Sequence, residues 1–274
     1  MLWLLLLQVW ASCLWLGHSE VVKNFTSCPQ FFYQNSPPNN NLQPQNPAWI
    51  CQCYKNGYFF ATLYNKTGRI PVYSAYKYEP ASGKGTHRWM VEPQLISPNL
   101  PKEMKRVSEL KKDYDVKPKQ LKESQAVNAD YKNLTGLDRG HLNPNAHHNT
   151  SDSRNATFTL TNAVPQNSTL NRGNWRVYEK KTMTQESQDC INTTYVITGA
   201  VPGNKFISNG RVNIPSHIWS GACCQTNNGM KTWAAIAANN QSQVTKLTLG
   251  QLEGNLTRLY GNGQVLLFHS NCPR

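Results

Sequence analysis

The sequence predicts an α+β fold, with a mainly antiparallel β-sheet and flanking helices. Aromatic and β-branched runs such as 58–64 (YFFATLY) and 69–78 (RIPVYSAYKY) indicate strands. Helical spacing is rarer and is scattered between these runs, an order that favours antiparallel pairing over alternating strand–helix units. The chain has 274 residues, 39% of them hydrophobic, which is enough for a sizeable core. Since no repeat or linker is visible, we expect residues 20–274 to form a single domain.

The chain begins with an apolar run, residues 1–16 (MLWLLLLQVWASCLWL). This run is shorter than the ~20 residues that a membrane-spanning helix needs. Gly17 and Ser19 follow it, small residues of the kind that a signal peptidase accepts. We therefore expect residues 1–19 to be a secretory signal peptide. The alternative is an uncleaved signal anchor, because no basic residue precedes the run. No second long apolar run follows, so we expect no transmembrane segment after cleavage.

Local patterns predict the other elements. Residues 34–47 are rich in Pro and Asn and indicate a loop. Asn65–Gly68, between the two aromatic runs, predicts a β-hairpin. The charged segment 102–112 fits either a short helix or a solvated surface. Further strands are expected at 156–163, 195–198, 231–237 and 264–268, and a helix at 170–184.

The cysteines and glycosylation sequons indicate an oxidising compartment. Seven cysteines remain when Cys13 leaves with the signal, so we expect three disulfides and one free thiol, with the pairing open. No pair has the CxxC spacing of a zinc ribbon. Nine Asn-X-Ser/Thr sequons accompany the signal, among them those at Asn133, Asn155 and Asn167. The chain is therefore expected to be a secreted, extracellular glycoprotein.

The charge balance favours a polyanionic partner. The formal net charge is +13, from 28 Lys and Arg against 15 Asp and Glu. Nucleic acid, a glycosaminoglycan or an anionic membrane surface would each suit this excess. Residues 102–122 hold eight basic side chains against four acidic ones, so part of this segment is a candidate phosphate-binding surface. The alternative is that the charge serves solubility alone.

Residues 136–179 carry the candidate chemistry. Phosphodiester hydrolysis needs a base for water, a cation and a fixed positive charge near the phosphate, and imidazole titrates in the right range for the base. Arg139 and His141 are two residues apart, so on an extended segment they would face the same side. Asn171 offers a carboxamide oxygen that suits Mg²⁺, which keeps most of its waters in proteins. The ordered blocks are Asp138-Arg139-Gly140-His141, Asn162-Ala-Val-Pro-Gln166, Leu170-Asn171-Arg172-Gly173-Asn174-Trp175 and Glu179.

These blocks resemble the signature of the non-specific DNA/RNA endonucleases of the ββα-metal type, the His-Me finger nucleases. The resemblance covers roughly residues 55–270, and the secreted, cysteine-containing layout is similar to that of endonuclease-domain-containing 1 proteins. It implies a ββα-metal core on the antiparallel sheet. It also implies one Mg²⁺ ion per site, with Mn²⁺ or Ca²⁺ as candidate substitutes, and nucleic acid as a partner bound through its backbone phosphates.

The resemblance implies roles for single residues. His141 matches the general base, and Asn171 and Glu179 match the residues that hold the hydrated ion. Arg139 matches the arginine beside the phosphate. The other catalytic matches are Asp138, which orients the signature loop, and Arg88, which contacts phosphate; the substrate-binding matches are Asn162, Gln166 and Arg172. A shift of one residue would put His87 in the place of Arg88.

The chain departs from the family pattern at Met183, where many members have a second arginine one helical turn after the glutamate. Loss of that charge would lower activity unless another basic residue substitutes for it. A glycan on Asn167 would crowd the groove next to Gln166. His147 and His148 are expected in a loop rather than at a metal ion, since no His or Cys accompanies them at zinc spacing.

Together these features predict a secreted, magnesium-dependent endonuclease that cuts DNA, RNA or both with little sequence specificity. One alternative is a catalytically weak or inactive glycoprotein on the nuclease fold that binds polyanions or cell surfaces, because a fold does not guarantee an activity. Another is a heparin-binding structural protein, whose binding would not depend on His141.

Overall fold

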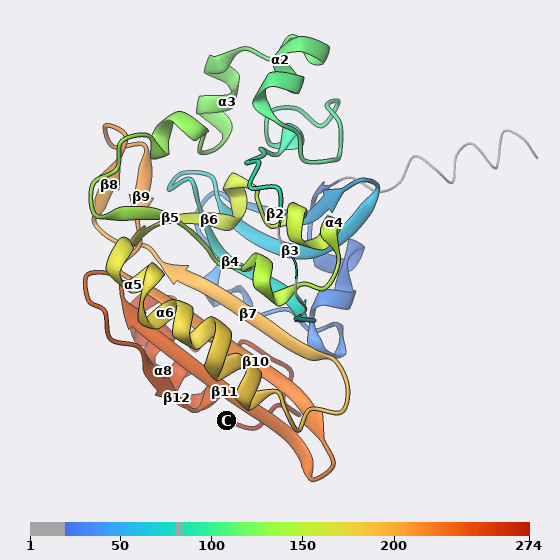
Figure 1. Cartoon of the computed structure of the whole chain (residues 1–274), viewed down its shortest axis with the longest axis vertical. Helices are drawn as coiled ribbons and strands as arrows, with labels where there is room; N and C mark the ends of the chain where they lie inside the picture. The colour runs from blue at the N-terminus through green and yellow to red at the C-terminus, as the bar shows by residue number, and fades with distance from the viewer. Residues whose placement is uncertain (1–19, 81–82, 84) are drawn as a thin grey trace, which may run out of the picture.

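An eight-stranded antiparallel β-sheet runs through the protein (Figure 1). The computed structural model describes residues 20–80, 83 and 85–274, so the expected signal peptide lies outside the described residues. The strands follow the order β1-β2-β3-β4-β7-β10-β11-β12. Their bounds are β1 (Val21–Val22), β2 (Pro47–Tyr54), β3 (Gly57–Asn65), β4 (Ile70–Tyr78), β7 (Thr194–Val201), β10 (His217–Thr226), β11 (Gly229–Ala238) and β12 (Thr245–Leu247).

The strands of the sheet confirm the α+β prediction. Strands β3 and β4 form the predicted hairpin, in which Leu63 lies opposite Tyr73. Strands β7 and β11 contain the predicted segments 195–198 and 231–237. All of the pairs in this sheet are antiparallel.

Different helices cover the two faces of the sheet. Consecutive residues of a strand point to opposite faces. Val196 and Ile197 of β7 accordingly belong to two different clusters of buried side chains. The cluster of Val196 includes Trp175, from the helical segment in front of the sheet in Figure 1. The cluster of Ile197 includes Leu252 of α8, which lies behind the sheet.

Helices, single turns and two small strand pairs complete the fold. The helices are α2 (Val107–Tyr114), α3 (Pro118–Ser124), α4 (Ser151–Ala156), α5 (Ser168–Arg172), α6 (Asn174–Val177), the π-helical turn η9 (Tyr178–Thr182), α7 (Met183–Glu186) and α8 (Leu249–Tyr260). The 3₁₀ turns are η1 (Phe25–Ser27), η2 (Pro29–Phe31), η3 (Tyr33–Asn35), η4 (Asn40–Leu42), η5 (Pro93–Leu95), η6 (Asn128–Tyr131), η7 (Asn145–His147) and η8 (Leu160–Asn162). The small pairs are β5 (Leu137–His141) with β6 (Ala163–Asn167), and β8 (Lys205–Ile207) with β9 (Val212–Ile214).

The β5–β6 hairpin and the helical segment after it form a ββα unit. Helix α5 follows β6 directly, and α6, η9 and α7 continue to Glu186. This segment was predicted as one helix over 170–184, but it breaks at Gly173. A Cβ at Gly173 would lie 2.4 Å from the Thr169 carbonyl oxygen, so the chain bends where a residue without a side chain is needed.

Two predicted strands are wrong. The segment 156–163 begins at the end of α4 and passes through η8, and β6 starts only at Ala163. The segment 264–268 forms no strand because its amides bond side chains of other elements. The Leu267 amide donates to Glu253 Oε1 of α8 at 2.8 Å. In the segment 102–112, which fitted either a short helix or a solvated surface, helix α2 begins at Val107.

The described residues contain three disulfides and one free thiol, which confirms the prediction from the number of cysteines. The bonds are Cys28–Cys51, Cys190–Cys224 and Cys223–Cys272, and Cys53 is free and buried. In the described part of the chain, every helix is too short or too polar to cross a lipid bilayer.

Candidate active site

Strand β5 presents Arg139 and His141 to one cavity. The two side chains are separated by Gly140 and share the ring of Trp89 as a neighbour, as their spacing predicted. We call this hollow, of about 570 Å³, the His141 cavity. Its lining includes His87, Trp89, Tyr131, Arg139, His141 and Phe158.

Two aromatic rings hold the Arg139 guanidinium. Its Cζ atom lies 4.7 Å from the centre of the Trp89 ring and 5.1 Å from that of Tyr131. Nη1 donates a hydrogen bond to Asn128 Oδ1 at 2.9 Å. Burial lowers the pKa of Arg139, but an arginine stays charged at neutral pH. The cavity therefore contains a positive charge in a fixed place, with Nε buried and unpaired among the described residues.

His141 is uncharged at neutral pH. Burial, together with the nearby Arg139 and His87, lowers the pKa of His141 to about 3. The ring centres of Trp89 and Phe158 each lie 4.8 Å from that of the imidazole. Nε2 is buried and has no hydrogen-bond partner in the described part of the chain. An imidazole in this state can accept a proton, and a bound phosphate would raise its pKa towards neutrality.

Asp138 joins the hairpin to the helical segment. It accepts hydrogen bonds from Asn171 Nδ2 at 3.0 Å, Arg172 Nε at 2.8 Å and Ser168 Oγ at 2.9 Å. Burial alone would raise the pKa of Asp138, but these hydrogen bonds outweigh it and hold the pKa below its usual range. Arg172, predicted to bind substrate, forms an exposed ion pair with Asp138 in this structure.

The predicted substrate residue Gln166 is buried over Gly140. It lies opposite Asp138 in the β5–β6 pair, and both polar atoms of its carboxamide lack partners among the described residues. A Cβ at Gly140 would lie 2.1 Å from Gln166 Oε1, which explains why glycine stands between Arg139 and His141. Because Gln166 has no exposed surface, the structure shows no direct path from it to a substrate.

Asn162 has a structural role rather than the substrate contact that we expected. It is fully buried. Its Oδ1 accepts from Ser74 Oγ and from the Asn143 amide, each at 2.9 Å. Its Nδ2 donates to the carbonyl oxygens of Asn143 at 2.9 Å and Thr157 at 3.0 Å. These four bonds use the full capacity of a carboxamide, so none is left for a ligand.

Glu179 lies farther along the helical segment, in the π-helical turn η9. Burial raises the pKa of Glu179 to about 8, and the nearby charges of Lys180 and Arg176 offset this only in part. His147 Nε2 donates to the Glu179 carbonyl oxygen at 2.8 Å, and Tyr76 Oη donates to His147 Nδ1 at 3.0 Å. The pair His147–His148 is therefore built into the protein interior, in the turn after β5, as a structural element.

The oxygen donors of α5 and η9 suit a hard divalent cation. Asn171 gives its amide hydrogen to Asp138, which leaves its carboxamide oxygen for a ligand. Glu179 is a half-buried carboxyl whose ionised form lacks a full counter-charge. In the described residues, no group of three or more His, Cys, Asp or Glu side chains could hold a metal ion. An ion held by Asn171 and Glu179 would thus keep most of its waters, as Mg²⁺ does.

The predicted residues form two neighbouring groups. Arg139 and His141 share the His141 cavity, whereas Asn171 and Arg172 bond Asp138. Asp138 belongs to both groups because it also lines the cavity. Within the described residues, no hydrogen bond or ring contact joins His141 to Asn171 or Glu179. That His141 and an ion held by Asn171 and Glu179 act on the same phosphate stays a prediction.

Arg88 does not line the His141 cavity. It lines a separate hollow with Lys55 and Arg106, whereas its neighbour His87 lines the His141 cavity. The two residues that flank Arg88, His87 and Trp89, both line the His141 cavity, so Arg88 faces the other way. The structure therefore places His87, the alternative to Arg88, at the His141 cavity, and which of the two contacts phosphate stays a prediction.

Met183 faces the interior. It is fully buried, and Trp233 Nε1 donates to its sulfur at 3.2 Å. The extra residue of the π-helical turn changes the helical register just before this position.

Asn167, where a glycan was expected to crowd the groove next to Gln166, caps α5. Its side chain accepts a hydrogen bond from the Leu170 amide at 3.1 Å.

Sequence reasoning missed the aromatic frame of the cavity. Trp89, Tyr131 and Phe158 come from three separate segments, so no local spacing links them to His141. Asn128, which bonds Arg139, was missed for the same reason. Only Trp89 carried a signal, since it directly follows Arg88, which the resemblance matched to a phosphate contact.

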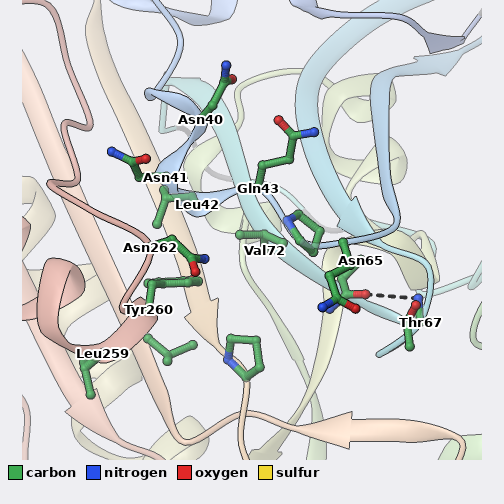
Figure 2. Close-up of a pocket in the computed structure, with 14 residues that line it drawn as sticks. Asn40, Asn41, Leu42, Gln43, Asn65, Thr67, Val72, Leu259, Tyr260 and Asn262 are labelled. Carbon is green, nitrogen blue, oxygen red and sulfur yellow. Dashed lines mark hydrogen bonds between the residues drawn. The ribbon is translucent and has the colours of Figure 1, made fainter.

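A second hollow carries none of the predicted residues. It has a volume of about 690 Å³ and lies between η4, the β3–β4 turn and the end of α8 (Figure 2). Figure 2 shows the carboxamides of Asn40, Asn41, Gln43 and Asn262 around it. The lining includes no charged or imidazole side chain, so it offers neither an acid–base group nor a phosphate contact by charge.

Comparisons with known proteins agree with the hairpin-and-helix geometry. The profile of the family described as DNA/RNA non-specific endonuclease matches residues 37–273. The human protein named endonuclease domain-containing 1 protein is 35% identical over 217 residues, which is 78% of this chain and 41% of that protein. The mouse protein of the same name is 34% identical over 210 residues, 73% of this chain and 39% of that protein. This chain therefore spans less than half the length of these relatives.

A solved structure shares the fold. A chain in the crystal structure of the EndoG/EndoGI complex aligns with a TM-score of 0.51 and 17% identity, over 77% of this chain and 84% of that chain. At this identity the likeness concerns the fold alone. It confirms the predicted class, an antiparallel sheet that carries a ββα core.

Proposed function

Because this chain belongs to the DNA/RNA non-specific endonuclease family, we propose that it is a secreted, magnesium-dependent endonuclease. It hydrolyses phosphodiester bonds inside DNA, RNA or both, with little sequence preference. One observation supports this most: a neutral imidazole, His141, lies beside the fixed charge of Arg139 in one cavity. Three disulfides support secretion, since such bonds persist in oxidising compartments.

Each residue of the candidate site has its own role in the proposed hydrolysis. His141 takes a proton from the water that attacks phosphorus, and the phosphate raises the pKa of the imidazole as it binds. Arg139 complements the charge that builds on the phosphate oxygens. Asp138 orients Asn171 through the hydrogen bond between them, and His147 fixes the backbone of Glu179. When bound, the divalent cation stabilises the departing 3′-oxygen, and the products are a 5′-phosphate and a 3′-hydroxyl.

We propose that another hollow, which we call the lysine-bearing hollow, leads the nucleic acid towards the His141 cavity. It has a volume of about 310 Å³, and Lys111, Lys122 and Lys132 line it. Asn128, the partner of Arg139, lines it as well. Lysines bind backbone phosphates without reading bases, so affinity is expected to fall with rising salt. This supports a role for part of segment 102–122 in binding.

A plasmid-nicking assay tests the proposal. Wild type should nick supercoiled DNA with Mg²⁺ and stop with EDTA, and the same assay with Mn²⁺ or Ca²⁺ defines the substitutes. His141→Ala should lower the rate by about 10²- to 10⁴-fold, the size of a general-base contribution. His269→Gln, in the C-terminal segment, is the control and should cut normally. If His141→Ala and wild type cut equally, the assigned base is wrong.

The alternative function is a non-catalytic polyanion binder on the same fold. The absence of a direct contact between His141 and Asn171 among the described residues favours it. In that case both wild type and His141→Ala would bind DNA and heparin, with the same salt dependence, and neither would cut. Heparin retention without DNA binding would instead indicate a heparin-binding structural protein.

A further inference from the structure

One asparagine of a glycosylation sequon lies at the rim of the His141 cavity. Asn133 stands in the turn between η6 and β5, and its side chain lines the cavity together with Arg139 and His141. The residue is exposed and has a positive φ of 55°. Asparagine tolerates this left-handed conformation better than most residues, so the turn holds Asn133 away from both neighbouring elements.

The sequon Asn133-Leu134-Thr135 is presented for modification. Asn133 and Thr135 are both exposed. In the described part of the chain, no hydrogen bond uses the Asn133 side chain. The sequon at Asn155 is the opposite case: its side chain is buried and accepts a hydrogen bond from the Thr86 amide at 2.8 Å. The fold therefore exposes one sequon at the cavity and uses the other for structure.

The position of Asn133 matters because its neighbour, Lys132, lines a different hollow. Lys132 lines the lysine-bearing hollow, and Asn133 lines the His141 cavity. A polynucleotide that lies in both would pass over the turn 132–133. Any bulky group on Asn133 would stand between the phosphate-binding lysines and His141.

We propose that Asn133 carries an N-linked glycan that restricts access of nucleic acid to the His141 cavity. This inference rests on the proposed function. In the transfer step, Asn133 Nδ2 forms a bond to C1 of the first N-acetylglucosamine of a lipid-linked oligosaccharide. The bond from C1 to the lipid diphosphate breaks, the diphosphate leaves, and the amide proton goes to a base. The secretory pathway that forms the three disulfides supplies this donor.

The glycan acts through its size. It is bulky and well solvated. It excludes a long, stiff polyanion from the rim more strongly than a small molecule, which diffuses around it. The unglycosylated protein is therefore the more active form on DNA, and the two forms differ little on a small phosphodiester.

The test compares four secreted proteins from the same mammalian cells: wild type, Asn133→Gln, Thr135→Ala and Thr135→Ser. Thr135→Ala removes the sequon but keeps Asn133, whereas Thr135→Ser keeps the sequon. Glycopeptide mass spectrometry measures occupancy at Asn133. We expect occupancy in wild type and Thr135→Ser, and at least tenfold faster plasmid nicking in the two variants without the sequon. Cleavage of bis(p-nitrophenyl) phosphate should change less than twofold.

A readout independent of nuclease activity completes the test. Fluorescence anisotropy in EDTA gives the Kd of each protein for a labelled DNA duplex at constant salt. This Kd should fall about tenfold when the sequon is removed, and Asn192→Gln, at a sequon whose asparagine is exposed outside the cavity, should leave it unchanged. An unmodified Asn133, or equal nicking and equal DNA affinity with and without the glycan, overturns the inference. If no protein cuts DNA but the glycan still weakens DNA binding, the proposed function fails and the shielding by the glycan stands.

Discussion

The guanidinium carbon of Arg139 lies 4.7 Å from the centre of the Trp89 ring. The ring of Trp89 also lies 4.8 Å from that of His141, so one indole holds both polar side chains of the cavity. This contact fixes the positive charge at the place where a phosphate would approach the imidazole. Cation–π contacts of this kind contribute roughly 0.5–2 kcal/mol, depending on exposure.

Trp89→Leu is expected to lower kcat/KM for plasmid cleavage about tenfold, because Arg139 loses one face of its aromatic frame. Trp89→Phe keeps a ring and should retain most of the activity. Steady-state rates at saturating Mg²⁺ provide the comparison, with thermal denaturation to confirm folding. Equal rates for the leucine and phenylalanine variants would show that the ring is not needed.

His87 should matter more than Arg88. His87 lines the His141 cavity and contributes to the lowered pKa of His141, whereas Arg88 lines a different hollow. His87→Ala is expected to change kcat/KM about fivefold, the effect of one electrostatic contact of ~1 kcal/mol. Arg88→Ala should change it less than twofold at constant salt. The reverse order would restore the assignment that the sequence alone favoured.

Strand periodicity was sufficient to predict part of this site and not the rest. The alternation of β5 places Arg139 and His141 on one side, and the aromatic runs of β3 and β4 pair as expected. Residue type could not decide between Arg88 and His87, because a shift of one residue moves the side chain from one hollow to the other. Asn162 and Gln166 matched the motif, but their burial depends on packing between segments that are distant in the sequence.

Asp138→Asn should raise the Mg²⁺ concentration needed for half-maximal cutting by about 10- to 100-fold, the usual effect of losing an outer-shell carboxylate. The neutral amide no longer attracts Arg172, and it competes with the Asn171 carboxamide as a donor. A titration of the nicking rate with Mg²⁺ measures this. Asp189→Asn, in an exposed ion pair with Lys231, is the matched control and should leave the titration unchanged. An unaltered Mg²⁺ requirement in Asp138→Asn would exclude a positioning role.

Met183→Arg should not increase activity. The side chain at 183 is buried against Trp233, so an arginine there would lack both water and a carboxylate partner. An unpaired buried charge costs about 3–5 kcal/mol, and the midpoint of thermal denaturation should fall accordingly. Met183→Leu, with a similar volume, should cost less than about 1.5 kcal/mol. Faster cutting by a stable Met183→Arg protein would mean that this position reaches the substrate.

His148 should make the protein sensitive to acid. Burial, with His147 and Arg154 nearby, lowers the pKa of His148 to about 3, and its Nε2 donates to Asn143 Oδ1 at 2.7 Å. The unfolded chain binds a proton at this residue below its ordinary pKa of ~6.5, whereas the folded protein does not. The contribution of neutral His148 to stability is therefore complete above that pH. It falls by up to ~1.4 kcal/mol per pH unit as the pH decreases towards 4.

Comparison of wild type with His148→Gln isolates this effect, because raised carboxyl pKa values elsewhere, such as that of Glu179, act equally on both proteins. Wild type should be the more stable of the two at pH 7.5, and its advantage should shrink steadily between pH 6.5 and 4.5 in urea denaturation. A constant difference between wild type and His148→Gln would mean that His148 takes up its proton in the folded state as readily as in the unfolded chain, so that the imidazole is not held neutral by burial.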